Sequence, residues 1–110
     1  MKIFTRIENG VFVAEFTGKL DTSTSGDAYD KMVNIAKECG SKLVLNLEKL
    51  EYMSRAGLSI LLMTSKLLQG SSRQMKICNP NDSVKEVLEF SEFNSLLHVY
   101  DNETDAIAAF

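Results

Sequence analysis

The chain has 110 residues, of which 45% are hydrophobic and 25% are charged, with one Pro and six Gly. This ordinary globular composition predicts a single domain over residues 1–110 whose core needs neither a metal nor a disulfide. The net charge of −3 argues against a nucleic-acid or membrane partner, because either would call for a basic surface.

The first expected element is a β-hairpin around Asn9-Gly10, the dipeptide that favours a two-residue type I′ turn. Such a turn pairs Glu8 with Val11 and continues outward along both strands. One face of the hairpin, which we assign to the core, then carries Ile3, Thr5, Ile7, Phe12, Ala14 and Phe16. The opposite face mixes charged residues with Phe4, Val11 and Val13, so it is either solvated or lightly covered.

A first helix is expected to begin at one of the hydroxyl residues in 22–25, which are all plausible N-caps, and to end at Gly40. Its inward positions recur at helical spacing: Ala28, Met32, Ile35, Ala36 and Cys39. The run 43–47 does not alternate, which is typical of a central strand covered on both faces. Glu48 and Glu51 follow in what we expect to be a loop.

A second helix is predicted from about Arg55 to Gln69, with Gly70 as its stop. One apolar stripe of this helix holds Leu58, Leu61, Leu62, Ser65 and Leu68. The opposite stripe holds Ile60, Met63 and Leu67. A helix on one face of a sheet cannot bury both stripes by itself. The second stripe is therefore either covered by a neighbouring helix or exposed for a partner.

The remaining elements are shorter. Residues 75–78 predict a strand, and 79–83 turn into a third helix that carries Val84, Val87, Leu88 and, as a further candidate, Phe90. Asn94-Ser95 leads to a strand at 97–100, and Asp101-Asn102 caps a last helix through Asp105, Ile107 and Phe110. The order β-β-α-β-α-β-α-β-α predicts an α/β fold, with a mixed sheet of about five strands and about four helices.

The reactive groups that an enzyme needs do not converge in this sequence. His98 is the only histidine and lies in an edge-like strand, and Glu48 with Glu51 makes an unconvincing acid/base pair. There is no phosphate-binding glycine motif, no Gly-x-Ser-x-Gly elbow and no Cys/His metal spacing. The sequence therefore predicts that the protein is not an enzyme, with no cofactor and no metal.

The sequence shows no secretory or membrane-spanning segment, which predicts a cytoplasmic protein. The longest apolar run, at 58–63, is too short to span a bilayer, and Met1-Lys2 leads into a strand-like pattern instead of a secretory signal. Cys39 and Cys78 stand singly in apolar settings, so we expect two reduced and mostly buried thiols.

Three sequence blocks carry a resemblance to a known family. They are Gly18-Lys19-Leu20-Asp21, Val44-Leu45-Asn46-Leu47 and Tyr52-Met53-Ser54-Arg55-Ala56-Gly57-Leu58. In order, they resemble the Gly-x-Leu-Asp, Val-Leu-Asp-Leu and Asp-Ser-Ser/Ala-Gly-Leu motifs of STAS domains, the group that contains bacterial anti-sigma factor antagonists. The likeness extends over about residues 3–109, and the third block is the most specific. It implies the STAS fold.

The resemblance implies a bacterial transcription regulator that binds an anti-sigma factor, itself a serine kinase, and thereby frees a sigma factor. In the family the kinase phosphorylates a serine at the start of the second helix, and a serine phosphatase reverses this. The residues implied in partner binding are Asp21, Thr22, Met53, Ser54, Arg55, Ala56, Gly57, Leu58, Ile60, Met63 and Leu67. Two alternatives remain: a STAS scaffold that self-associates or joins other STAS proteins, and a small-ligand sensor with a pocket near Asp21.

This sequence departs from the family at the switch. Arg55 stands where the family has its phosphorylated serine, so phosphorylation is not expected at that position, while Asn46 replaces the strand aspartate. Ser54, one residue earlier, is either a helix N-cap or the one remaining phosphorylation site. Arg55 is either a solvated residue, for which Asp21 and Glu51 are candidate ion-pair partners, or a contact to an acidic partner surface or an anionic ligand.

Overall fold

The computed structural model describes residues 1–89 and 97–110. Its elements follow in the order β1 (Lys2–Glu8), β2 (Val11–Leu20), α1 (Ser25–Glu38), β3 (Lys42–Met53), α2 (Arg55–Gln69), β4 (Gln74–Cys78), α3 (Asp82–Glu89), β5 (His98–Tyr100) and α4 (Glu103–Ala108). The predicted order of strands and helices is confirmed. The expectations for Phe90 and for Asn94-Ser95 lie outside the described residues.

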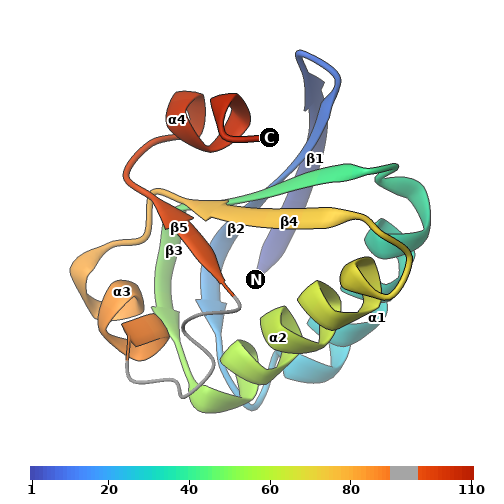
Figure 1. The fold of residues 1–110 in the computed structure, drawn as a ribbon. Helices are drawn as coiled ribbons and strands as arrows, with labels where there is room; N and C mark the ends of the chain where they lie inside the picture. The colour runs from blue at the N-terminus through green and yellow to red at the C-terminus, as the bar shows by residue number, and fades with distance from the viewer. Residues whose placement is uncertain (90–96) are drawn as a thin grey trace.

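The strands form one mixed sheet with the spatial order β1-β2-β3-β4-β5. β1 and β2 are antiparallel, and each later neighbouring pair is parallel. Asn9 and Gly10 both have positive φ, at 51° and 77°, as a type I′ turn requires. Figure 1 shows the N-terminal hairpin at one side of the sheet and β5 at the other. The predicted α/β fold and its hairpin are therefore confirmed.

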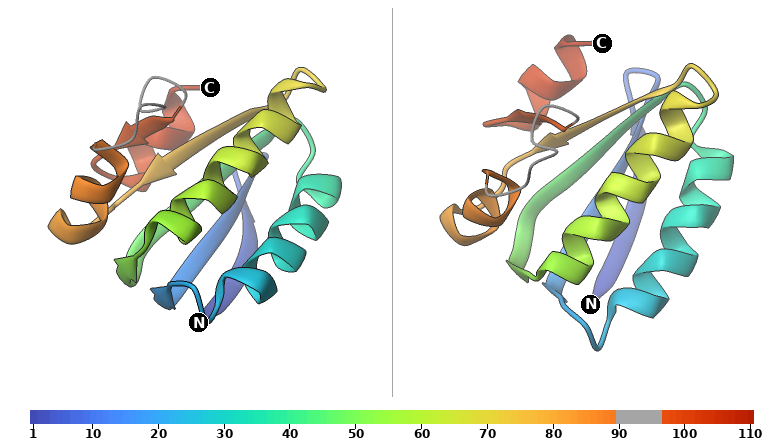
Figure 2. Two further views of the ribbon diagram at one scale, coloured as in Figure 1. Left: turned by 90° about the horizontal axis from the view of Figure 1, so that it is seen from below. Right: turned by 60° about the horizontal axis from the view of Figure 1, so that its bottom comes forward.

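Helices cover both faces of the sheet, but unequally. α1 and α2 lie side by side on one face (Figure 2), whereas α4 lies on the other (Figure 1). The larger core, which also includes residues of α3, contains Phe16, Leu20, Met32, Leu45, Leu61 and Leu88. The smaller core beneath α4 contains Val11, Val13, Val44, Cys78 and Ala106. The central strand β3 is thus covered on both faces, as its unbroken apolar run predicts.

The predicted core face of the hairpin is only partly right. Ala14 and Phe16 are buried, but Thr5 is exposed and Ile7 is 71% exposed. Val11 and Val13 of the opposite face are buried instead. The reason is that Val11 and Val13 belong to the buried cluster that includes Ala106 of α4, while β1 is the edge strand and its outer end is left uncovered.

A charged network joins β1 to α4. The Arg6 guanidinium pairs with Glu8 at 3.1 Å and with Glu15 at 3.2 Å, and it also contacts the carboxylate of Glu103. The hydrogen bond to Glu103 is the main cause that raises the pKa of Arg6 above its ordinary value. Asn46 donates to Glu103 at 3.0 Å. Arg6 and Asn46 therefore both contact Glu103, the first residue of α4.

Strand β3 is longer than the sequence predicts. It pairs with β2 from Leu43 to Met53. Glu48 and Glu51 therefore lie on a strand, and the expectation that they occupy a loop is wrong. The sequence shows the apolar part of β3, but the pairing with β2 extends the strand beyond it.

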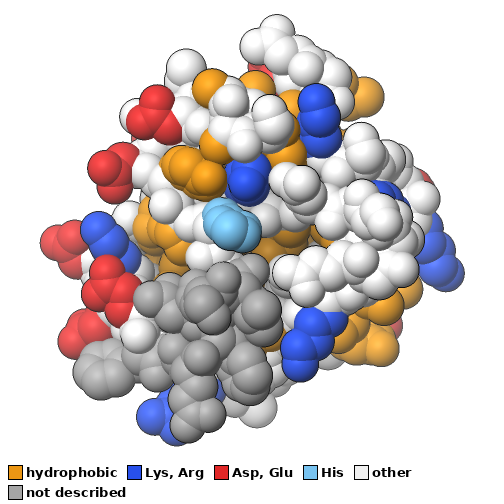
Figure 3. All heavy atoms as spheres, viewed as in Figure 1, with side chains coloured by type: hydrophobic (Ala, Val, Ile, Leu, Met, Phe, Trp, Pro, Cys, Tyr) orange, Lys and Arg blue, Asp and Glu red, His pale blue; other side chains and the backbone are white. Residues whose placement is uncertain are grey.

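The two cysteines are buried and the histidine is exposed. Cys39 and Cys78 are free and buried, as predicted. Burial is the main cause that raises the pKa of Cys78 to about 12, so its thiol stays protonated at neutral pH. His98 is exposed on the edge strand β5, and the histidine side chain is visible on the face shown in Figure 3. In residues 1–89 and 97–110, no three His, Cys, Asp or Glu side chains gather where they could hold a metal.

Within the described part of the chain, no helix combines the length and the apolar character needed to cross a membrane.

Candidate functional site

The candidate site lies at the sheet edge where β2 and β3 end. These strands are parallel, so their carboxyl ends meet at the same edge, where binding loops commonly gather. Leu20 and Met53 are paired at the two strand ends, and the backbone N–H of Ser54 donates to the Leu20 carbonyl at 2.9 Å. This bond brings the loop that begins at Asp21 next to the start of α2.

The Asp21 carboxylate orders that loop. Its Oδ1 accepts from the Ser23 hydroxyl at 2.6 Å, from the Ser23 backbone N–H at 2.9 Å and from the Thr24 backbone N–H at 3.3 Å. These bonds, that of the Ser23 hydroxyl first, lower the pKa of Asp21 below its ordinary value. Thr24 is the N-cap of α1, within the predicted range, and Thr22 is exposed in the same loop. The loop thus presents Thr22 on an ordered backbone.

Ser54 is the N-cap of α2, which is one of the two roles predicted for it. Its backbone is extended, with φ −88° and ψ 175°, and its Oγ accepts from the Gly57 backbone N–H at 3.3 Å. The bond satisfies one of the N–H groups that a helix start leaves without an intrahelical partner.

Removing this cap should weaken the fold measurably. We expect Ser54→Ala to lower the free energy of unfolding by about 1 kcal/mol, because the Gly57 N–H loses its acceptor. Urea unfolding of Ser54→Ala beside Ser54→Asp measures this, since Asp is also a good N-cap and should keep most of the stability. Equal loss in both variants would contradict a capping role.

Arg55, the first residue of α2, is exposed. Within residues 1–89 and 97–110 it forms no ion pair, so the alternative pairing with Asp21 or Glu51 is wrong. The first turn of α2 contains no acidic residue. A cation here opposes the helix dipole and is not neutralised by a neighbour, so the site presents an exposed positive charge.

Several residues implied in partner binding are not on the surface. Asp21, Ser54, Ala56 and Met63 are partly exposed, and Thr22, Arg55 and Leu67 are exposed. The buried members of the set are Met53, Gly57, Leu58 and Ile60. Their expected place on an exposed contact surface is wrong, because Met53 ends β3 inside the larger core and α2 turns the other three positions inward. These residues pack beneath the exposed members of the set.

Gly57 lets α2 approach the end of β2. A Cβ atom at this position would lie 2.6 Å from Leu20 Cγ and 2.9 Å from the Leu20 carbonyl oxygen. Both distances are shorter than a Cβ atom tolerates, and the second involves the backbone. The glycine of the third sequence block is therefore needed for close packing of the helix start on the strand.

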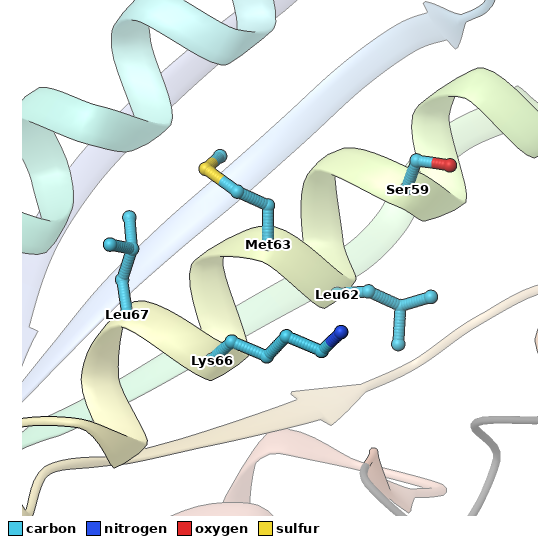
Figure 4. Close-up of a pocket in the computed structure, with 5 residues that line it drawn as sticks. All are labelled: Ser59, Leu62, Met63, Lys66 and Leu67. Carbon is cyan, nitrogen blue, oxygen red and sulfur yellow. The ribbon is translucent and has the colours of Figure 1, made fainter.

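A shallow apolar groove of about 520 Å³ runs along the outer side of α2. Its lining residues are Ser59, Leu62, Met63, Lys66 and Leu67. In Figure 4, Met63 and Leu67 extend toward the side of α2 where α1 lies, and Leu62 extends the other way. Sequence reasoning placed Leu62 on the inner stripe and Ile60 on the outer one. The structure reverses both, because the rotation of α2 is set by its packing on the sheet and beside α1.

Comparisons with known proteins agree on one family. The sequence profile of the STAS domain matches residues 2–106. The chain is 30% identical over 99 residues to an anti-sigma F factor antagonist of Paenibacillus polymyxa, covering 89% of this chain and 85% of that protein.

Solved structures share the fold. An anti-sigma factor antagonist of Mycobacterium paratuberculosis superposes with a TM-score of 0.87 at 20% identity, covering 98% of this chain and 92% of the other. The Bacillus cell fate determinant SpoIIAA in its phosphorylated form superposes with a TM-score of 0.71 at 18% identity, covering 98% of each chain.

Proposed function

The chain belongs to the STAS domain family, and from this premise we propose that it binds an anti-sigma factor of the serine-kinase type and thereby frees a sigma factor. The name of the Paenibacillus relative supports a role of this kind. The observation that carries the proposal is the exposed Arg55 at the capped start of α2, beside the ordered loop that presents Thr22. Arg55 has no ion-pair partner among the described residues.

The proposed contact surface continues from the helix start along α2. Arg55, Ser59, Leu62 and Lys66 follow one another at spacings of three and four residues, so they lie on one face of the helix. The apolar groove therefore begins one turn after the Arg55 cation. This arrangement favours a partner that places an acidic group at Arg55 and apolar side chains in the groove.

The proposed binding does not depend on a phosphate switch. Arg55 has no hydroxyl group, and the Ser54 hydroxyl is already used as the helix cap. A phosphate on Ser54 would add about −1.5 to −2 charges beside the Arg55 cation and at the positive end of a helix. Arg55 and the helix start would partly neutralise that added charge, so it would change the surface less than at an uncharged position. We therefore propose that the contact surface is permanently available and that a serine phosphatase is not required.

Charge reversal at Arg55 tests the contact. We expect Arg55→Glu to weaken binding to a purified serine-kinase-type anti-sigma factor from the same genome by about tenfold or more. Titration calorimetry measures this, and the effect should shrink as salt is raised. The matched control is Lys42→Glu at the opposite end of β3, also an exposed cation. Equal affinity of Arg55→Glu and wild type would contradict the proposed contact.

The absence of a switch is tested by incubating the protein with that kinase and ATP. The mass of the wild type should stay constant, whereas Arg55→Ser should gain one phosphate, because the hydroxyl then stands where the family carries it. A phosphate that appears on the wild type and is lost in Ser54→Ala would overturn the non-switching proposal.

A further inference from the structure

Strand β1 is an open sheet edge with exposed apolar side chains. Ile7 is 71% exposed and Phe4 56%, more than any other large hydrophobic side chain in the described ranges. β1 pairs with β2 on one side, and among residues 1–89 and 97–110 no strand lies along its other side. An unpaired edge strand of this kind is ready to add another strand.

We propose that two copies of this chain pair through their β1 strands, antiparallel, about a twofold axis at Thr5. The pairing would join two five-stranded sheets into one continuous sheet. It does not depend on the proposed binding of an anti-sigma factor, because α2 and the loop that presents Thr22 take no part in it.

The hairpin determines which backbone groups of β1 face the open edge. A two-residue turn makes Glu8 and Val11 a hydrogen-bonded pair, and hydrogen-bonded pairs alternate along an antiparallel ladder. Arg6 and Phe4 therefore also direct their backbone groups toward β2. The backbone N–H and C=O groups of Ile3, Thr5 and Ile7 point the other way, toward the open edge.

These outward groups match a second copy of β1. In antiparallel pairing centred on Thr5, Ile3 stands opposite the partner's Ile7, and Thr5 opposite the partner's Thr5. All of these are positions whose backbone groups face the edge, so the ladder closes symmetrically. The exposed Ile7 would then be covered by the partner's Ile3 on the α1 side of the sheet.

The charges of β1 select this register. With Thr5 at the centre, Lys2 faces the partner's Glu8 and Phe4 faces the partner's Arg6, giving ion pairs and cation–π contacts. A shift of two residues in one direction places Lys2 opposite the partner's Arg6. A shift in the other direction places Arg6 opposite the partner's Arg6, and in-register parallel pairing sets every charge opposite its own kind.

The mass of the protein in solution tests the pairing. Light scattering of the full chain over a range of concentrations should show the mass rise toward twice 12.3 kDa. A mass that stays at 12.3 kDa up to the limit of solubility would overturn the proposal. Neither result bears on binding to an anti-sigma factor, which is measured separately.

Charge exchange then tests the register. Glu8→Lys should weaken the dimer by about tenfold, because both symmetric ion pairs become repulsive. Glu8 also pairs with Arg6 of its own chain, so the decisive variant is the double change Lys2→Glu with Glu8→Lys, which should restore the dimer. The matched control is Leu67→Ser, which removes an exposed apolar side chain from α2. A dimer that survives Glu8→Lys but is lost in Leu67→Ser would overturn the proposal.

A cysteine placed on the axis gives an independent readout. Thr5→Cys should form a disulfide-linked dimer on mild oxidation, since opposed residues of a hydrogen-bonded pair lie about 5.5 Å apart at Cα. Ile7→Cys should not, because the two copies of that residue would lie about 13 Å apart along the strands. Cys39 and Cys78 are buried and should not interfere. Equal linking of both variants would contradict the twofold axis at Thr5.

Discussion

Gly57→Ala is expected to destabilise the protein by about 1–3 kcal/mol, the usual cost of overfilling a packed site. The added methyl group would lie 2.6 Å from Leu20 Cγ and 2.9 Å from the Leu20 carbonyl oxygen. That carbonyl already accepts the Ser54 N–H bond which ties β2 to the start of α2. The helix start must therefore move away from the strand, and both the cap and the position of Arg55 move with it.

Thermal unfolding measures the effect, and a melting temperature about 4–8 °C lower per kcal/mol is expected for a domain near this size. Gly26→Ala is the matched control, because a Cβ atom at Gly26 in α1 meets nothing within 4 Å. Alanine is the better helix former, so the control should be about 0.5–1 kcal/mol more stable than wild type. A Gly57→Ala variant as stable as wild type would show that the start of α2 does not need this close approach.

Met53→Ala is expected to lower the free energy of unfolding by about 2–5 kcal/mol. Met53 ends β3 one residue before the cap, and its side chain is fully buried in the larger core. Removing it leaves a cavity beneath the proposed contact surface. Met63→Ala, on the outer side of α2, removes the same group from a partly exposed place and should cost much less.

Comparing the two methionine variants distinguishes a buried supporting residue from a residue that contacts the partner. Urea unfolding should rank Met53→Ala far below Met63→Ala in stability. Calorimetry with the anti-sigma factor should show weaker binding for Met63→Ala at a temperature where each variant is folded. A stable Met53→Ala variant that has lost binding would contradict the core position of Met53.

The turn at 53–58 therefore has two layers. Met53, Gly57 and Leu58 are buried and pack the helix start on the end of β2. Ser54 and Arg55 stand above them, one as the cap and the other as an exposed cation. Variants in the lower layer should act through stability and variants in the upper layer through binding.

Local signals in the sequence predicted the elements well. The bounds of α2 at Arg55 and Gln69 agree with the prediction, because a cap residue and a following glycine act on the backbone next to them. The hairpin turn agrees for the same reason, since Asn9 and Gly10 tolerate positive φ. Asn102 caps α4 as expected, with its side chain accepting from the Asp105 N–H at 2.8 Å.

Burial was predicted less well. The inner positions of α1 are right, because the whole helix packs on one surface. The hairpin face is wrong at Thr5 and Ile7, because β1 is an edge strand whose outer end is uncovered. The other face is covered, since Val13 is buried in the cluster that includes Ala106 of α4. No residue near the hairpin could indicate that arrangement.

The same distinction holds for the site. The sequence by itself indicated the order of the elements, the cation at Arg55 and the cap as one of two roles for Ser54, because each depends on neighbours along the chain. The tertiary structure decided that Met53 and Ile60 are buried, that Leu62 lines the groove and that β1 remains an open edge. These depend on how α2 is rotated and on which faces the other helices cover. Both are set by packing between segments that are distant in sequence, which no local pattern records.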